Sequence, residues 1–246
     1  MILLLQKLKQ KKELIIMKID KRRHYILVVD TETANTHRVD NALDFSSALV
    51  YDCGWCVCDT AGNIYLERSF ANADLFFGYA DLLNTAYYAD KLPQYWEDIK
   101  TGKRKLATTA TLRRIMIEDM VKFGITEVMA HNARFDITVL NATIRYITKS
   151  DKRYWFPYGT EIWDSMKMSK DVICKMPTYK RFCEENNLLT KTGRVSASAE
   201  NLYKFISKNP QFIESHTGLE DVQIEREIFF YCRRQKKKMR KKLWEN

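Results

Sequence analysis

Two carboxylates lie two residues apart at the end of an apolar run, in the stretch Val28-Val29-Asp30-Thr31-Glu32. On a strand, residues i and i+2 point to the same side, so Asp30 and Glu32 converge on one point at the edge of a sheet. Two carboxylates this close repel each other unless a proton or a cation lies between them. Carboxylate oxygens suit hard divalent cations such as Mg²⁺ and Mn²⁺. The pair therefore predicts a divalent-cation site at the end of the strand.

Two further motifs carry the residue types that such a site needs. Asn132 and Asp136 lie in the sequence HNARFD, and His216 stands five residues before Asp221. Each motif is weak by itself, since a lone aspartate at a helix start is usually a cap. Together they place carboxylates at a strand end, a helix start and the first turn of a terminal helix. In an α/β fold, such side chains meet at the carboxyl edge of the sheet.

Apolar patterning predicts the elements that position these motifs. The continuous apolar run before Asp30 predicts a central strand that is buried on both faces. Other strands are expected over residues 48–59 and 63–70, joined as a hairpin, and over 126–130 and 161–164. Helices are expected over 111–123, after 136, near 165–174, 177–187 and 197–208, and after 217, while the polar stretch 33–47 is expected to be a loop. This order indicates one α/β or α+β domain whose helices cover a sheet.

The composition is that of an ordinary globular protein, with 246 residues, 46% apolar and 29% charged. No segment approaches the roughly 18 apolar residues of a membrane span, and residues 2–5 are too short for a signal-peptide core. We therefore expect a cytoplasmic protein with no membrane partner. Cysteines in such a protein are reduced. Cys53 and Cys56 have CxxC spacing but read as small buried strand residues rather than a zinc or redox site, with Cys56 and Cys58 on one face.

The net charge of +10 is concentrated at the two ends of the chain. Residues 1–23 carry +6 and residues 233–246 carry +7, which leaves −3 for the residues between them. Such ends are either solvated tails or contacts to the phosphate backbone of a nucleic acid, and charge alone does not separate these readings. We divide the chain into a basic N-terminal extension (1–23), a main domain (24–235) and a basic C-terminal tail (236–246).

A long insertion separates Glu32 from Asp136. Residues 71–106 are rich in aromatic side chains, which are read as core rather than as a base-stacking platform. The segment is expected to be helical and to end in an exposed basic turn over residues 100–105. Its place in the chain fits a lid on the substrate side, a partner surface or an additional core layer.

The order and spacing of the motifs resemble those of the DEDDh exonucleases of the ribonuclease-H-like superfamily, over residues 25–235. This family includes the proofreading epsilon subunit of bacterial DNA polymerase III, the PolC-type exonuclease domain, ribonuclease T and oligoribonuclease. The sequence VDTET, which begins at Val29, resembles the first exonuclease motif. AHNARFD resembles the second, HTGLED resembles the third, and WDSM, from Trp163, resembles a strand end of the epsilon-like members.

The resemblance implies an α/β, ribonuclease-H-like fold, with a mixed five-stranded sheet of order 3-2-1-4-5 flanked by helices. It implies 3′→5′ removal of nucleoside 5′-monophosphates and two divalent metal ions, Mg²⁺ or Mn²⁺, held by Asp30, Glu32, Asp136 and Asp221. His216 would be the general base. These roles are chemically sound, because two ions can activate water and stabilise a leaving 3′-oxygen, and a histidine accepts protons near neutral pH.

Four residues beside the motifs are candidates for binding the terminal nucleotide: Thr31, Thr33, Asn132 and Phe135. For Asn132 and Phe135, an equal alternative is that they only pack and cap the helix. Other polar residues near the motifs are expected to be structural. Asp164 is expected to cap the helix after its strand. The solvated face of the last helix is expected to hold Glu220, Glu225 and Glu227, and no ligand spacing is seen for His24, His37 and His131.

The main prediction is an exonuclease that acts on single-stranded DNA ends or oligonucleotides. An exoribonuclease of the ribonuclease T or oligoribonuclease type is an alternative, because contacts to a 2′-hydroxyl cannot be located from sequence. A non-catalytic nucleic-acid-binding protein on the same fold is another. The acidic cluster argues against this last reading, since it would repel phosphate. A proofreading role would require a separate polymerase or replication protein as partner.

Overall fold

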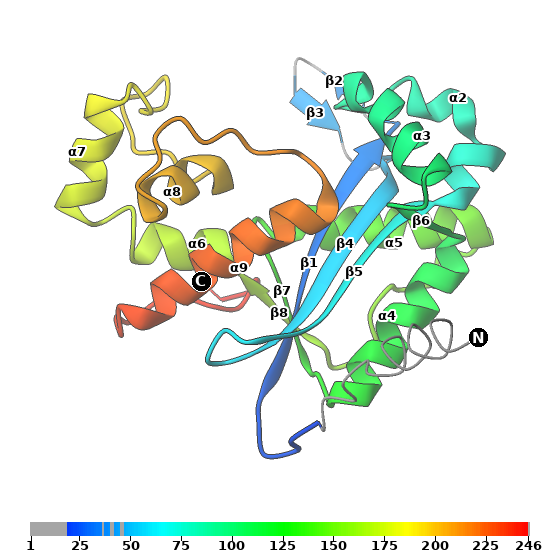
Figure 1. Cartoon of the computed structure of the whole chain (residues 1–246), viewed down its shortest axis with the longest axis horizontal. Coiled ribbons are helices and arrows are strands. Elements are labelled where there is room, and N and C mark those ends of the chain that lie inside the picture. Colours follow the sequence, from blue (N-terminus) through cyan, green and yellow to red (C-terminus); the bar gives the residue numbers. More distant parts are fainter. Residues whose placement is uncertain (1–18, 36, 40–41, 45–46, 246) are drawn as a thin grey trace, which may run out of the picture.

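The computed structural model describes residues 19–35, 37–39, 42–44 and 47–245. Most of the expected N-terminal extension and the side chain of His37 lie outside the described residues. The main sheet has six strands in the order β6-β5-β4-β1-β7-β8 (Figure 1). Their bounds are β1 (Tyr25–Ala34), β4 (Leu49–Asp59), β5 (Ile64–Asn72), β6 (Lys105–Ala107), β7 (Glu127–Ala130) and β8 (Glu161–Asp164).

The core of the sheet confirms the predicted fold class. The strands β5-β4-β1-β7-β8 reproduce the order 3-2-1-4-5, with β4 antiparallel to its neighbours and β7 and β8 parallel to β1. The sixth strand, β6, was not expected and pairs in parallel with β5. The loop predicted over 33–47 is partly wrong. Strand β1 continues to Ala34, and β2 (His37–Val39) pairs with β3 (Ala42–Asp44) in a small separate sheet.

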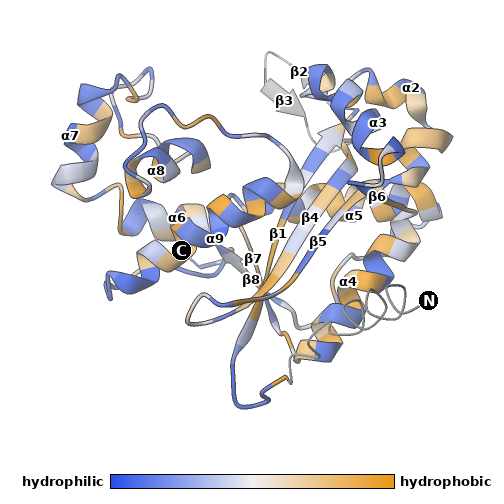
Figure 2. Ribbon diagram, viewed as in Figure 1, coloured by the Kyte–Doolittle hydropathy of each residue, from blue (hydrophilic) through white to orange (hydrophobic). Residues whose placement is uncertain are grey.

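Helices cover both faces of the sheet (Figure 1). One core cluster joins β1, β4 and β7 to α4 (Thr109–Phe123) and α5 (Arg134–Thr148). The other joins the opposite face to α6 (Ser165–Asp171), α7 (Pro177–Glu185), α8 (Ala199–Ile206) and α9 (Gly218–Arg234). The lower part of β1 is apolar (Figure 2), and residues 25–29 are almost completely buried. Both sides of this strand need apolar side chains, which explains the uninterrupted run in the sequence.

The predicted hairpin joins β4 to β5. Asp59 accepts hydrogen bonds from the backbone amides of Ala61 and Asn63, which closes the turn. Cys53 faces the first core cluster, while Cys56 and Cys58 face the second, as strand alternation predicts.

The insertion over residues 71–106 forms the elements η1 (Asp74–Gly78), α2 (Ala80–Leu83), η2 (Ala89–Lys91) and α3 (Leu92–Lys100), followed by β6. Phe76 and Tyr95 are buried in a third core cluster with residues of β4, whereas Tyr87 is exposed. The prediction of an exposed basic turn over 100–105 is wrong for Arg104. This side chain is buried against Asp52 at 2.8 Å, because the insertion folds back onto β4.

The C-terminal segment lies along the free edge of β8 instead of extending as a tail. The amide of Leu243 donates to the carbonyl of Ile162, and the amide of Asp164 donates to the carbonyl of Lys241. Arg240 forms an ion pair with Asp171. Part of the positive charge is thus used within the fold, and the edge of β8 is covered. Among the described residues, no helix is long and apolar enough to cross a membrane.

Candidate active site

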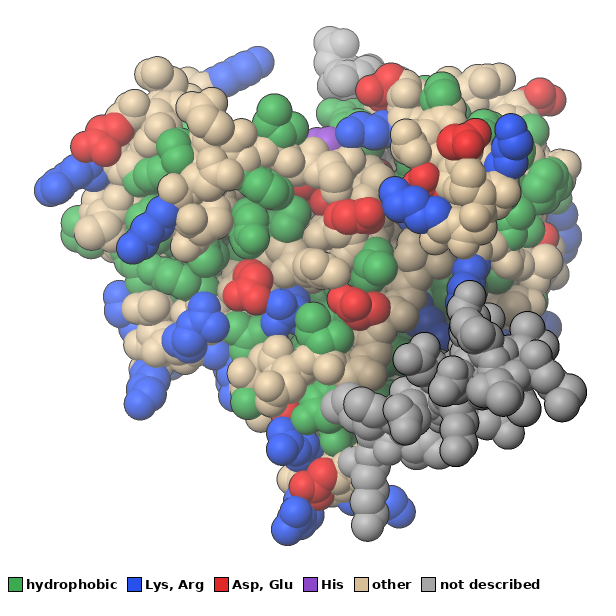
Figure 3. Space-filling model, in the orientation of Figure 1, with side chains coloured by type: hydrophobic (Ala, Val, Ile, Leu, Met, Phe, Trp, Pro, Cys, Tyr) green, Lys and Arg blue, Asp and Glu red, His purple; other side chains and the backbone are tan. Residues whose placement is uncertain are grey.

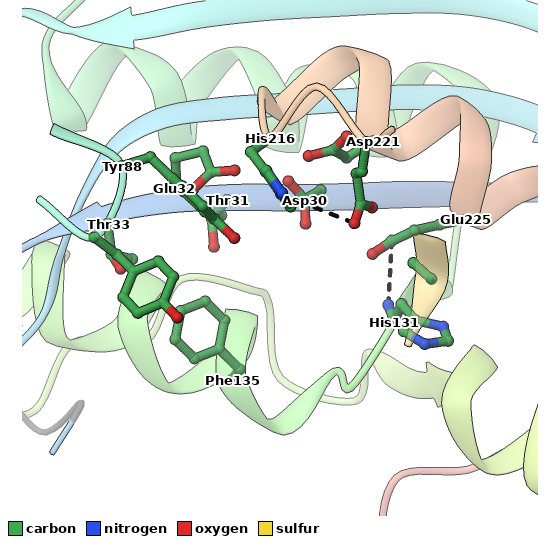
Figure 4. A pocket seen from close by; sticks show the side chains of 13 residues that line it. Asp30, Thr31, Glu32, Thr33, Tyr88, His131, Phe135, His216, Asp221 and Glu225 are labelled. Carbon is green, nitrogen blue, oxygen red and sulfur yellow. Dashed lines mark hydrogen bonds and ion pairs between the residues drawn. The ribbon is translucent and has the colours of Figure 1, made fainter. Parts of the chain in front are cut away.

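The three motifs meet at one cavity of about 280 Å³ beside the end of β1 (Figure 4). On the face shown in Figure 3, Asp and Glu side chains lie both over the middle and at the rim, and many Lys and Arg side chains lie toward the periphery. The carboxylates that line the cavity are Asp30, Glu32, Glu214, Asp221 and Glu225. They come from β1, from the loop before α9 and from α9 itself. The cavity therefore combines parts of the chain that are almost 200 residues apart.

Strand β1 places Asp30 and Glu32 just past its pairing with β7, which ends at Val28. Both side chains point into the cavity (Figure 4). One carboxylate oxygen of Asp30, Oδ2, is buried without a hydrogen-bond partner. Burial and the nearby charge of Asp221 raise the pKa of Glu32 to about 10. Burial, followed by the charges of Glu225 and Asp136, also raises the pKa of Asp30 well above its usual range.

Asp136 lies in the first turn of α5 and is almost fully buried. The hydroxyl of Thr31 donates to Asp136 Oδ1 at 2.9 Å, so the strand motif and the helix motif are connected directly. Burial raises the pKa of Asp136 to about 7, against the lowering effect of the Thr31 hydrogen bond. Thr31 and Thr33 also line the cavity, and they remain candidates for contact with a substrate.

Asp221 reaches the cavity because α9 begins directly on the backbone of β4. A Cβ atom built on Gly54 would lie 2.3 Å from the carbonyl carbon of Gly218, so this approach requires glycine. Asp52 Oδ2 accepts a hydrogen bond from the amide of Gly218 at 2.9 Å. One turn into the helix, Asp221 is buried, and burial with the charge of Glu214 raises its pKa to about 8.

His216 precedes α9 in a left-handed backbone conformation with φ of 52°. Its ring stacks on Tyr88, with the ring centroids 4.2 Å apart and the planes 11° apart. Each of Glu32, His216 and Asp221 offers one potential ligand atom, and these atoms lie within 4.8 Å of one another. Burial lowers the pKa of His216, and the positive charge of Lys91 lowers it further. The imidazole is therefore neutral near pH 7, the state that accepts a proton.

The residues of the second motif divide into two groups. Phe135 lines the cavity and also packs partly against the core, whereas Asn132 is exposed and does not line it. The alternative in which Asn132 caps α5 is wrong, because the N-cap residue is Ala133, which makes no side-chain cap hydrogen bond. Instead, the amide of Asn132 donates to Asp164 Oδ1 at 3.1 Å. The same oxygen accepts from two amides at the start of α6, which confirms Asp164 as a cap.

Glu225 was expected on the solvated face of α9, and this prediction is wrong. The side chain is only 3% exposed and faces the cavity, and its Oε2 accepts a hydrogen bond from the backbone amide of His131 at 3.1 Å. Its position four residues after Asp221, one helical turn along the same face, was the available signal. Glu214 and Tyr88 were also missed. The ring of His131 bonds to Ser165 and to the carbonyl of Ala197, and the residue borders the cavity.

The buried carboxylates of the site lack positive partners. Across the described ranges, no Lys or Arg forms an ion pair with any member of the site cluster: Asp30, Glu32, Asp136, Asp221 and Glu225. Buried carboxylates are normally paired or bound to metal. A set of oxygen donors with one imidazole fits Mg²⁺ or Mn²⁺, and the unpartnered Asp30 Oδ2 offers a free ligand atom. The donor set therefore fits a divalent-cation site.

No protein-family model and no curated protein sequence matches the chain. The chain does match solved protein structures. A 3′-exonuclease, described as recognising the 3′ end of a histone mRNA stem-loop, matches with a TM-score of 0.59 at 12% identity, over 89% of this chain and 85% of that one. E. coli exonuclease I, in complex with a dT13 oligonucleotide, matches with a TM-score of 0.51 at 17% identity, over 87% of this chain and 41% of that one.

S. pombe Pop2p, in a form with Mg²⁺ and Mn²⁺ bound, matches with a TM-score of 0.50 at 13% identity, over 91% of this chain and 88% of that one. The chain spans less than half of exonuclease I but most of the other two proteins. These likenesses show that the chain shares the α/β fold of these solved structures. The resemblance seen in the sequence is thus confirmed at the level of the fold.

Proposed function

We propose that the chain is a metal-dependent 3′→5′ exonuclease that hydrolyses the terminal phosphodiester bond of DNA, on single-stranded ends or oligonucleotides, and releases nucleoside 5′-monophosphates. The observation that carries this proposal is the meeting of Glu32, His216 and Asp221 within 4.8 Å in a cavity whose buried carboxylates have no positive partners. The fold shared with exonucleases supports it.

Asp30, Glu32, Asp136 and Asp221 would hold two divalent ions, Mg²⁺ or Mn²⁺. Bound divalent ions supply charge neutralisation and make water a nucleophile near neutral pH, which is what hydrolysis of an anionic phosphodiester requires. The carboxylates of β1 are held on a strand that is rigid by burial, and Thr31 fixes Asp136 relative to them. Such supported side chains keep their geometry when the substrate binds.

His216 accepts the proton of the attacking water. Among the described residues no hydrogen bond is made to its ring, so a ring nitrogen can accept the proton. The neutral state that burial and Lys91 favour is the state this step needs. Thr33 and Phe135, which line the cavity, would contact the terminal sugar and base by hydrogen bonding and packing. Asn132 is exposed outside the cavity, so its contribution would lie farther along the strand.

RNA is a second candidate substrate. It is favoured by the structural neighbour with a TM-score of 0.59, which is described with an mRNA stem-loop, whereas the exonuclease I structure holds a DNA oligonucleotide. A non-catalytic binding protein is disfavoured, because an unneutralised carboxylate cluster repels phosphate and serves binding poorly. If the activity is proofreading, the partner would be a separate polymerase or replication protein.

The test is digestion of 5′-labelled single-stranded DNA, duplex DNA and RNA with Mg²⁺, Mn²⁺ or EDTA. We expect a ladder that shortens from the 3′ end and is abolished by EDTA. Asp30→Ala should remove the activity, and His216→Ala should reduce it by about 10²- to 10⁴-fold. Asp151→Ala, a change at an exposed loop carboxylate, is the matched control. An inert wild-type protein that still binds DNA, or cleavage inside a circular single strand, would overturn the proposal.

A further inference from the structure

His216, the residue assigned as proton acceptor, has little support from its own loop. His216 has a left-handed backbone, which non-glycine residues rarely adopt. Among the described residues, no hydrogen bond to its ring is present, and the nearest carboxylate, that of Glu214, is 3.8 Å from Nδ1. The second side-chain torsion of histidine has broad intrinsic preferences, so the plane of the ring must be set by what it contacts.

The ring contact comes from the insertion over residues 71–106. Tyr88, directly before η2, stacks face to face on His216 with planes only 11° apart (Figure 4). Three residues later, Lys91 Nζ donates to the carbonyl oxygen of Ser215 at 2.9 Å. One short turn thus holds both the His216 ring and the backbone next to it.

The same turn is attached to the strand that carries Glu32. The amide of Tyr87 donates to the carbonyl of Thr33 at 3.3 Å, and the amide of Asn35 donates to the hydroxyl of Thr85 at 2.8 Å. Because these contacts join the insertion to the end of β1, the position of Tyr88 is defined relative to the β1 carboxylates. The insertion therefore sets the distance between His216 and Glu32.

A second attachment lies on the other side of His216. Asp52 accepts hydrogen bonds from Tyr95 Oη at 2.7 Å, from Arg104 Nη1 at 2.8 Å and from the amide of Gly218 at 2.9 Å. Tyr95 and Arg104 belong to the insertion, and Gly218 begins α9. The backbone is thus fixed at residue 215 and at residue 218, one residue before His216 and two after it.

From these contacts we propose that the insertion is a clamp that orients the His216 imidazole, with Tyr88 as the positioning residue for the ring and Lys91 as the positioning residue for the adjoining backbone. This inference rests on the proposed role of His216. It assigns to residues 71–106 a task in building the site, beyond a core layer or a partner surface. Tyr88 acts through His216, and it affects the rate of the chemical step more than the binding of substrate.

The test compares Tyr88→Leu, Tyr88→Phe and Lys91→Met in the full chain with Mn²⁺, using an oligonucleotide substrate. Tyr88→Leu removes the stacking face, and we expect kcat to fall by about 10²-fold with KM little changed, since a displacement of about 1 Å can cost that much. Tyr88→Phe keeps the face and should restore most of the lost kcat. Lys91→Met should lower kcat by a smaller factor. Trp96→Leu, at a half-exposed ring elsewhere in the insertion, is the control.

A spectroscopic readout separates positioning from general damage. The chain has four histidines, so the ¹H–¹³C spectrum of their rings is simple, and His216→Ala identifies the His216 signals. The stacked Tyr88 ring should shift those signals upfield in the wild type and in Tyr88→Phe, and Tyr88→Leu should release the shift. Unchanged His216 signals in Tyr88→Leu would overturn the inference. A Tyr88→Leu variant whose KM rises while its kcat is unchanged would also overturn the inference, because Tyr88 would then be a substrate contact.

The failure of the proposed function has a different signature. A fully active His216→Ala variant would remove His216 from the mechanism, whereas the ring signals would still report whether Tyr88 holds it. If Tyr88→Leu does not fold, the comparison of Tyr88→Phe with Lys91→Met decides. If Lys91→Met then has the kcat of the wild type and His216 signals unchanged from the wild type, the proposal that the insertion orients His216 is contradicted.

Discussion

Glu32 and Asp52 are register partners on the neighbouring strands β1 and β4, and the protein neutralises only one of them. Asp52 is fully buried and accepts hydrogen bonds from Arg104, Tyr95 and the amide of Gly218. Glu32 is 8% exposed, and no described Lys or Arg pairs with it. Two carboxylates opposite each other in one sheet thus have opposite environments.

The same contrast extends to another buried carboxylate, Asp119. Asp119, on α4, is paired with Arg68 and accepts a hydrogen bond from the indole of Trp55. The site cluster accepts hydrogen bonds from the hydroxyls of Thr31 and Ser215 and from the amide of His131, but no described Lys or Arg pairs with it. For Asp52 and Asp119 the chain provides its own positive charge, whereas the buried cap Asp164 is held by backbone amides. The site cluster therefore marks the place where a charge from outside the chain is expected.

The largest expected effect follows from Asp30→Asn. It removes a ligand from the site, and we expect activity to fall by about 10³-fold, since metal ions contribute several kcal/mol of transition-state stabilisation. In EDTA the melting temperature should be unchanged or higher, because a carboxylate without a partner is removed. Single-turnover digestion and thermal melting measure the two effects. If Asp30→Asn clearly lowered the melting temperature in EDTA, Asp30 would belong with the structural carboxylates.

The structural carboxylates should respond in the opposite way. Arg104→Met leaves the Asp52 carboxylate buried without its cation, and we expect unfolding to become easier by about 3–5 kcal/mol in urea denaturation. Arg114→Met is the control. Arg114 and its partner Glu118 are 60% and 59% exposed, and such a surface ion pair contributes about 0.2–1 kcal/mol. If both variants lowered the free energy of unfolding by equally small amounts, the distinction between the structural carboxylates and the site cluster would fail.

The pH dependence of stability should reveal that the site carboxylates have no Lys or Arg partner among the described residues. Burial raises the pKa of Glu32 to about 10, of Asp221 to about 8 and of Asp136 to about 7, above their usual values near 4. Groups whose pKa is higher in the folded state stabilise it at low pH, and this stability is lost as pH rises from about 4 to 8 and beyond. In EDTA we expect the melting temperature to fall between pH 5 and pH 8, by about 2–4 °C per kcal/mol lost.

Two controls accompany that experiment. Mn²⁺ added at pH 8 should recover much of the loss, because it neutralises the carboxylates. The double variant Glu32→Gln/Asp221→Asn should show a flatter pH dependence in EDTA than the wild type. A melting temperature that is insensitive to pH in the metal-free wild-type protein would contradict the electrostatic account.

The smallest of these effects is expected from Glu225→Gln. The variant keeps an oxygen for the amide of His131 but removes a negative charge that faces Asp30. Loss of such a supporting group typically weakens metal affinity about 10- to 100-fold. Titration with Mn²⁺ measures it, and Glu227→Gln, on the same helix but 36% exposed, is the matched control. An unchanged affinity in Glu225→Gln would return Glu225 to a structural role.

The residues whose positions at the cavity could be predicted depend on patterns that are local in sequence. The alternation of a strand brings Asp30 and Glu32 to one side, and the starts of α5 and α9 carry Asp136 and Asp221. These features depend on periods of two and of 3.6 residues, which can be read from a short stretch. The sheet order followed from the family resemblance, and the structure agrees with it over five strands.

The parts that were missed depend on contacts between distant segments. Arg104 was predicted to lie at the surface, because its partner Asp52 is 52 residues away in the sequence. Tyr88 gave no sign that it would meet His216, since that contact requires the whole insertion to fold over β1 and β4. Strand β6 has only three residues and no pattern of its own, so its pairing with β5 is set by the tertiary structure.

The most direct test of the central claim is the binding of Mn²⁺ to the metal-free protein, followed by the electron paramagnetic resonance signal of free Mn²⁺. We predict that the wild type binds Mn²⁺, that Glu32→Gln/Asp221→Asn loses this binding, and that Asp119→Asn, a change at a paired carboxylate, retains it. Equal binding by the wild type and the double variant, or no binding by the wild type, would contradict the claim that the site cluster binds a divalent cation.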